Sequence, residues 1–238
     1  MPGAEIKSIA RKILFDSAPK IFYISLIFVI LDTVTSELIF RLPGTSSAYS
    51  QFLEQIQTGV IPEIGLFLSY LRPVGLALAA VLWLLVGVYR AGFMFYCLKK
   101  SRGQDADYKD IVDAFAFFIK IITIMIITNV IVFLWSMLFI IPGVVASYRY
   151  RKAYFILFDD PEKSALQCIR ESKRIMRRNK LDLFLLDISL VGWHILNLLI
   201  IALIPSPFII PIIMVWLSPY TGISRATFYD NLLKRLAV

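Results

Sequence analysis

Apolar residues in this chain gather in long runs rather than alternating with polar ones. Five runs are plain, at residues 21–40, 74–98, 118–141, 181–204 and 207–224, and a shorter run covers 143–158. A helix of about 20 apolar residues is long enough to cross the hydrocarbon core of a bilayer. A barrel strand would alternate in polarity, whereas Leu198–Ile204 is apolar at every position. The pattern therefore predicts an all-α, polytopic bundle of membrane helices.

The positions of lysine and arginine predict how these runs cross the membrane. Basic residues concentrate in the N-terminal segment, in 99–115, in 159–180 and at the C-terminus. Short cytoplasmic loops carry an excess of Lys and Arg. If 143–158 crosses, all four basic segments are cytoplasmic, which predicts six transmembrane helices in the cell (cytoplasmic) membrane with both termini in the cytoplasm. The alternative is that 143–158 is re-entrant or interfacial, because it is short and contains three basic residues.

Three landmarks recur in the same order along the chain. Each unit has a lysine at the start of its first apolar run and a proline turn after that run. The second run of each unit ends in a four-residue motif, in which a basic residue is followed by alanine, any residue and phenylalanine. The landmarks are Lys20, Lys120 and Lys180, then Pro43, Pro142 and Pro205, then Arg90–Phe93, Lys152–Phe155 and Arg225–Phe228. One interpretation is a threefold repeat within a single membrane domain, 1–238, with units at 3–98, 107–158 and 163–235. The other is three unrelated hairpins that obey the same charge rule.

Each predicted unit is a transmembrane hairpin preceded by a cytoplasmic amphipathic helix. The apolar faces of these helices, read at helical spacing, are Ile6, Ile9, Ala10, Ile13 and Leu14, then Tyr108, Ile111, Val112 and Phe115, then Ala165, Ile169, Ser172 and Met176. The first unit also contains an insertion, 44–73, which we expect on the extracytoplasmic side. Its stretches 48–57 and 61–71 have a helical pattern.

Composition supports a membrane location and narrows the possible chemistry. The chain is 58% hydrophobic with a net charge of +8, and its mean hydropathy is +0.74. Positive charge on cytoplasmic loops favours anionic lipid over nucleic acid as a partner. The sequence has one histidine, His194, and no HExxH, Walker or GxSxG motif. We therefore expect no metal, no cofactor and no enzymatic activity, and we interpret His194 as a packed or interhelically bonded residue.

Charged residues within the apolar runs are the candidate binding residues, because ionisable groups inside a membrane are costly and often functional. They are Arg90, Arg149, Arg151, Lys152, Asp187 and Arg225. Counted from the cytoplasmic ends of their helices, Arg151 and Asp187 lie about 10 Å deep. One hypothesis is a basic cavity that binds an anionic headgroup, a phosphate or a carboxylate. The other is a helix-locking ion pair, with Arg90, Lys152 and Arg225 forming either a ring or three separate anchors.

From residue 89 onward, a series of short motifs resembles a known family. The motifs are Trp135, Ile141-Pro142-Gly143, Ser147-Tyr148, Tyr154–Leu157, Asp160-Pro161, Ser164-Ala165, Asn179-Lys180, Leu183–Ser189, Gly192-Trp193, Pro219-Tyr220 and Phe228-Tyr229. In this order they resemble a bacterial integral membrane family catalogued as domain of unknown function 975. The resemblance implies a bacterial cytoplasmic membrane and brings no activity with it. The N-terminal third is similar only in style.

These observations favour a non-enzymatic membrane module that interacts with lipid or acts as a scaffold or accessory subunit. Its expected partners are membrane lipids, especially anionic headgroups, and either another protein or a second copy of the chain. A small transporter or exporter component with a basic, cytoplasm-facing cavity is the alternative, since intramembrane charges and proline-broken segments are typical of transporters. An intramembrane enzyme acting on lipid or peptide is a third hypothesis, for which no catalytic group is recognisable.

Overall fold

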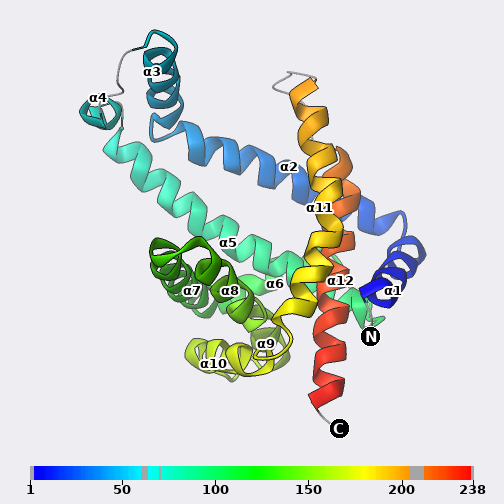
Figure 1. Cartoon of the computed structure of the whole chain (residues 1–238). Coiled ribbons are helices and arrows are strands. Elements are labelled where there is room, and N and C mark those ends of the chain that lie inside the picture. Colours follow the sequence, from blue (N-terminus) through cyan, green and yellow to red (C-terminus); the bar gives the residue numbers. More distant parts are fainter. Residues whose placement is uncertain (1–2, 60–63, 70, 204–211, 237–238) are drawn as a thin grey trace. The chain divides into compact units, whose positions relative to one another are not determined.

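The structure is a computed structural model of the whole chain, and it describes residues 3–59, 64–69, 71–203 and 212–236. Every regular element in those residues is helical (Figure 1), which confirms the all-α prediction. The predicted proline turn at Pro205 lies outside the described residues, as does the start of the run 207–224.

Four long apolar helices are able to span a membrane by length and composition. They are α2 (Lys20–Arg41), α5 (Pro73–Ser101), the stretch Tyr108–Leu138 and α11 (Lys180–Leu203). The third consists of α6 (Tyr108–Asp113), the 3-10 turn η1 (Ala114–Phe117) and α7 (Phe118–Leu138). Many apolar side chains of these helices are exposed, for example Ile119 and Met137 of α7. The chain is therefore a multi-pass membrane protein.

The run 143–158 forms two short helices instead of one long helix. These are α8 (Ile140–Tyr150) and α9 (Ala153–Asp159), separated at Arg151 and Lys152. The side chain of Ser172 inserts at this break. Its hydroxyl accepts a hydrogen bond from the Lys152 backbone N–H (3.2 Å) and donates one to the Arg149 carbonyl (3.0 Å). Because Ser172 supplies partners for backbone groups on both sides, the helix can break there without leaving them unsatisfied.

Two of the predicted proline turns fall within the described residues. The turn after α2 lies at 42–44, as predicted, and Gly44 within it has a φ of +84°. The second turn is at Phe139, which is extended (φ −158°, ψ 150°), and Pro142 lies inside the first turn of α8. The prediction that Pro142 itself makes the turn was wrong, because the first helical turn needs no N–H from proline and so tolerates it.

The helices fall into two compact units, Met1–Val29 with Gly87–Val238, and Ile30–Val86. In the first unit, α7, α8 and α9 pack with α10 (Ala165–Ile175), drawn in green to yellow-green in Figure 1. A further packed group joins α1 (Gly3–Asp16), α11 and α12 (Ile212–Leu236). One buried core contains Ile124 of α7 and Leu157 of α9 together with Leu183 of α11.

The second unit contains most of the predicted insertion 44–73. Its helices are α3 (Thr45–Gln57) and α4 (Ile64–Ser69), placed between the second half of α2 and the first half of α5. The Arg72 N–H donates to the Pro43 carbonyl at 2.8 Å, which closes the base of the insertion. The helical pattern predicted for 48–57 is present throughout, and the one predicted for 61–71 is present at 64–69, whereas Leu71 is not helical.

The amphipathic helices bury the predicted faces in two cases of three. In α1, Ile6, Ala10 and Leu14 are buried. In the third segment Ala165, Ile169, Ser172 and Met176 are all buried. In α6 the structure differs, because Tyr108 and Val112 are exposed while Asp110 and Ile111 are buried. Asp110 accepts a hydrogen bond from the Asp107 N–H (2.7 Å) and pairs with Lys99, and these contacts rotate the acidic side of α6 inward.

Candidate functional site

Asp187 on α11 contacts two arginines from different helices. The Arg225 Nε of α12 donates to Asp187 Oδ1 at 3.0 Å. Arg151, at the α8–α9 break, pairs with Oδ2. The Tyr148 hydroxyl of α8 also donates to Oδ2, at 3.0 Å. Since the Asp187 side chain is only 10% exposed, this arrangement joins three elements through one largely buried carboxylate and leaves one positive charge in excess.

Lys152 lies beside this cluster and is completely buried. Its Nζ donates to the Arg225 backbone carbonyl at 2.8 Å and lies 5.0 Å from the ring centres of both Phe155 and Phe228. Two of the three predicted anchors, Lys152 and Arg225, are therefore neighbours. The third, Arg90 on α5, has an exposed side chain.

Arg149 belongs to a different feature, a pocket of about 480 Å³ that we call the basic pocket. Six basic side chains line it: Arg149, Arg170, Lys173, Arg174, Arg177 and Lys180. Within the described part of the chain no acidic side chain lines this pocket. The basic pocket gathers more positive charge than the Asp187 cluster, and α10 and the turn after it supply most of it.

Local sequence explains why α10 presents its basic residues together. A capping box starts the helix: Ser164 Oγ accepts from the Gln167 N–H (3.3 Å), and Gln167 Oε1 accepts from the Ser164 N–H (2.7 Å). The buried face of the helix packs on α7, α8 and α9, so its basic residues face outward. The acid in this helix, Glu171, pairs with Lys163 at 2.8 Å and lies 3.8 Å from Arg174 of the basic pocket, and the hydrogen bond to Lys163 raises the pKa of the Lys163 amine.

An apolar groove of about 660 Å³ adjoins the basic pocket. Its walls are Ile140, Ile141, Val144, Val145 and Tyr148 of α8 and Leu181 and Phe184 of α11, and its basic rim is Arg177, Arg178 and Lys180. The rings of Tyr148 and Phe184 meet edge to face with centres 5.6 Å apart. Arg177 and Lys180 line both the groove and the basic pocket, so the two features are continuous.

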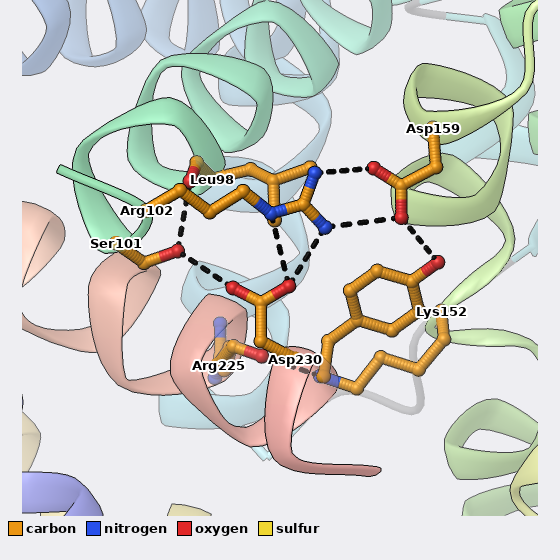
Figure 2. A network of polar contacts seen from close by, with 8 residues as sticks. Leu98, Ser101, Arg102, Lys152, Asp159, Arg225 and Asp230 are labelled. Carbon is orange, nitrogen blue, oxygen red and sulfur yellow. Dashed lines mark hydrogen bonds and ion pairs between the residues drawn. The ribbon is translucent and has the colours of Figure 1, made fainter. Parts of the chain in front are cut away.

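A second polar network, shown in Figure 2, was not predicted from the sequence. Arg102, just after α5, donates to both oxygens of Asp159 at 2.6 and 3.0 Å and to Asp230 Oδ1 at 2.7 and 3.0 Å. The Tyr229 hydroxyl donates to Asp159 Oδ2 at 2.9 Å. The hydrogen bonds from Arg102 to Asp159, with those to Asp230, raise the pKa of the guanidinium.

Asp159 lies before the basic helix and has no part in starting it. That helix starts at Ala165, with Ser164 as its cap. Asp159 instead ends α9 and pairs with Arg102. One member of the Arg102 network could have been noticed in the sequence. Tyr229 belongs to the Phe228-Tyr229 motif of the family resemblance, and Asp230 is the next residue.

Other predicted chemistry is dispersed. His194 is exposed on α11, which contradicts a packed position, while its other interpretation, an interhelically bonded residue, stays a prediction. In the described ranges, no three His, Cys, Asp or Glu side chains lie close enough to bind one metal ion.

Comparison with protein families finds a match to the family described as Protein of unknown function (DUF975), over residues 1–147 and 137–236. The chain belongs to the DUF975 family. The DUF975 match begins at residue 1, so it includes the N-terminal third, for which the sequence had shown only a general similarity to the family and no shared motif. No curated protein and no solved structure matches the chain.

Within this DUF975 chain, the six predicted site residues separate into three places. Arg151, Asp187 and Arg225 form one cluster with Lys152 against its edge. Arg149 faces the basic pocket and Arg90 is exposed. The residues that sequence reasoning missed, Arg170 to Lys180, are those of the amphipathic helix and its following turn. Their charge pattern was visible, but which of them share a pocket depends on how α10 packs against α8.

Proposed function

We propose that this DUF975 protein is a non-enzymatic membrane module that binds anionic lipid headgroups at the cytoplasmic surface. The observation that carries the proposal is the basic pocket, in which six cationic side chains converge without an acidic one among the described residues. The inner leaflet carries negative headgroups, and each nearby Lys or Arg contributes roughly 1 kcal/mol to its attraction. Arginine also matches phosphate oxygens in pairs, which favours a phosphate-bearing headgroup.

The proposal includes six membrane crossings with both termini in the cytoplasm. The two crossings beyond the four long helices are α8 with α9, and α12 with the residues before it. Together α8 and α9 cover Ile140–Asp159, about 30 Å if helical throughout. This topology is supported by the charge pattern, since it places 159–180 and the other basic segments on one side. A reporter fused at Pro161 tests it, and an extracytoplasmic signal contradicts it.

In this proposal the Asp187 cluster has a structural role. Its carboxylate uses both oxygens on Arg151, Arg225 and Tyr148, and so little of it remains to bind a solute. The transporter alternative needs a solute path, and the basic pocket by itself does not supply one. Solute flux in proteoliposomes that hold the purified protein would favour that alternative.

Headgroup selectivity in detergent solution tests the proposed function. We expect phosphatidylglycerol to raise the unfolding midpoint more than phosphatidylcholine with the same chains, because a bound ligand stabilises the folded state. The double variant Arg170→Gln with Lys173→Gln should bind phosphatidylglycerol about thirtyfold more weakly, at roughly 1 kcal/mol for each basic residue lost. Both side chains are exposed, so the substitutions spare the core.

The matched control is Arg11→Gln with Lys12→Gln on α1, which removes the same charge from exposed positions outside the basic pocket. It should keep the preference for phosphatidylglycerol. If the pocket variant and the control behave alike, the attraction comes from overall charge and the pocket is not the site.

A further inference from the structure

The apolar groove and the basic pocket have the dimensions and polarity of one elongated, two-part ligand. The groove runs along α8 from Ile140 to Tyr148, about 12 Å of helix. Among the described residues that line it, the basic ones are Arg177, Arg178 and Lys180. A ligand that fits this arrangement has an apolar chain and a negative group joined to one end of it.

We propose that a single anionic glycerophospholipid binds here, with one acyl chain in the groove and its phosphate between Arg177 and Lys180. This inference rests on the proposed function and names its ligand more closely. Arg177 and Lys180 are the two basic residues that line both features, so they mark the junction between chain and headgroup. The remaining cations of the basic pocket then surround the distal part of the headgroup.

The groove walls are exposed in a way that suits an acyl chain. Ile140 and Ile141 are 80% and 77% exposed, and Leu181 is 64% exposed, so apolar surface lies open beside the cationic rim. Lipid tails are as apolar as these side chains, so the groove holds an acyl chain by van der Waals packing against its walls, and a group that fills the groove removes that packing. The groove orients the lipid, while the cations select the charge of the headgroup.

Charge favours a lipid over a second copy of the chain as the occupant. In a symmetric dimer the same surface meets itself, so the arginine- and lysine-bearing rim would face an identical rim. Like charges brought together across an interface are strongly unfavourable. An anionic lipid brings the opposite charge, and it is present in the membrane at high local concentration.

The floor of the groove links the lipid site to the Asp187 cluster. Tyr148 lines the groove, and its hydroxyl donates to Asp187, which pairs with Arg151. An acyl chain packed on the Tyr148 ring therefore restricts the motion of Tyr148, whose hydroxyl orients the Asp187 carboxylate. Lipid binding should accordingly stabilise the packing of α8 on α11 as well as neutralise the rim.

Native mass spectrometry of the purified full chain in detergent tests the proposal by titrating defined lipids. Dipalmitoyl phosphatidylglycerol should bind as one retained lipid, while glycerophosphoglycerol, the same headgroup without acyl chains, should bind at least about tenfold more weakly. Val144→Trp places a ring in the groove and should weaken phosphatidylglycerol binding about tenfold. The bulky ring occupies the space of the acyl chain, and overpacking of this kind has a free-energy cost that corresponds to a loss of about tenfold in affinity. Val144 is 41% exposed, so its wall position is accessible.

Val130→Trp on α7 is the matched control, because Val130 is also half exposed and lines no part of the groove. It should bind the lipid as the unsubstituted chain does. A second variant, Arg177→Gln with Lys180→Gln, removes the junction charge without filling the groove, and should weaken binding about thirtyfold. It keeps the test valid if Val144→Trp does not fold.

The outcomes separate this inference from the proposed function. Equal binding of phosphatidylglycerol and glycerophosphoglycerol overturns the acyl-groove assignment. Unchanged binding by Val144→Trp overturns it too, while the proposed function stands provided that Arg170→Gln with Lys173→Gln still loses headgroup preference. If that pocket variant and the junction variant both bind normally, the proposed function fails along with the inference.

Discussion

The guanidinium of Arg102 donates two parallel hydrogen bonds to the carboxylate of Asp159, at 2.6 Å from Nη1 and 3.0 Å from Nη2. These residues are 57 positions apart in the chain. The same guanidinium also reaches Asp230 within α12, so one side chain after α5 joins the end of α9 to α12 (Figure 2). Paired N–H groups in a fixed plane make this geometry specific to arginine.

Loss of Arg102 should destabilise the packing of α5, α9 and α12. Replacement by Gln leaves two carboxylates facing each other, both less than a quarter exposed. We expect Arg102→Gln to lower the free energy of unfolding by about 1.5–3 kcal/mol, the range for hydrogen bonds to charged groups. Arg102→Lys should recover only part of this, because one ammonium cannot reproduce the paired contact. Denaturant unfolding in detergent, with Lys100→Gln as control, measures both. Equal stability of the Gln variant and the control contradicts the prediction.

Asp187→Asn should remove the negative charge that Arg151 and Arg225 share, and it replaces one of the two acceptor oxygens with an NH2 donor. The variant leaves two arginines side by side in a poorly solvated site, and we expect a loss of about 2–3 kcal/mol in the free energy of unfolding. Asp182→Asn on the same helix is the control, since Asp182 is 55% exposed and lies 3.8 Å from Arg235. A stable Asp187→Asn variant that has lost lipid or solute binding would mean that the cluster is a binding site.

Lys152 offers a test of whether a buried amine is needed for folding. Its stem and amine are surrounded by Phe155, Phe228 and the Arg225 carbonyl. Lys152→Met preserves the volume and removes the polar group, so stability should change by less than about 1.5 kcal/mol. Lys152→Ala creates a cavity and should cost about 2–5 kcal/mol. If both variants lose stability equally, the hydrogen bond to Arg225 matters more than packing.

Gly92 and Gly192 provide a matched pair of helical glycines. A Cβ at Gly92 would collide with the Ile111 backbone carbonyl, whereas a Cβ at Gly192 meets nothing within 4 Å. Gly92→Ala should therefore separate α5 from α6 and cost about 1–3 kcal/mol, as overpacking does. Gly192→Ala should be neutral or slightly stabilising, because alanine favours a helix over glycine by roughly 0.5–1 kcal/mol. Thermal unfolding of both proteins checks the difference, and similar midpoints would refute the close approach.

Apolar length was the most reliable guide to the fold. It predicted α2, α5, α7 and α11, because backbone groups in lipid must be satisfied within each segment and a helix does so locally. It did not predict the division at Arg151 and Lys152, where Ser172 from another helix bonds to the backbone. In the site, depth counting gave Arg151 and Asp187 a similar depth from the cytoplasmic surface, and the structure pairs these two residues.

The sequence by itself determined that this chain is helical, multi-pass and basic at particular segments, because those properties depend on each segment's own length and composition. Only the tertiary structure decided that Arg149 faces α10 while Arg151 faces Asp187, although the two arginines are two residues apart. It also decided that Arg102 meets Asp159 and that α8 and α11 enclose a groove. These relationships join residues far apart in the chain, and the rotation of one helix against another sets them.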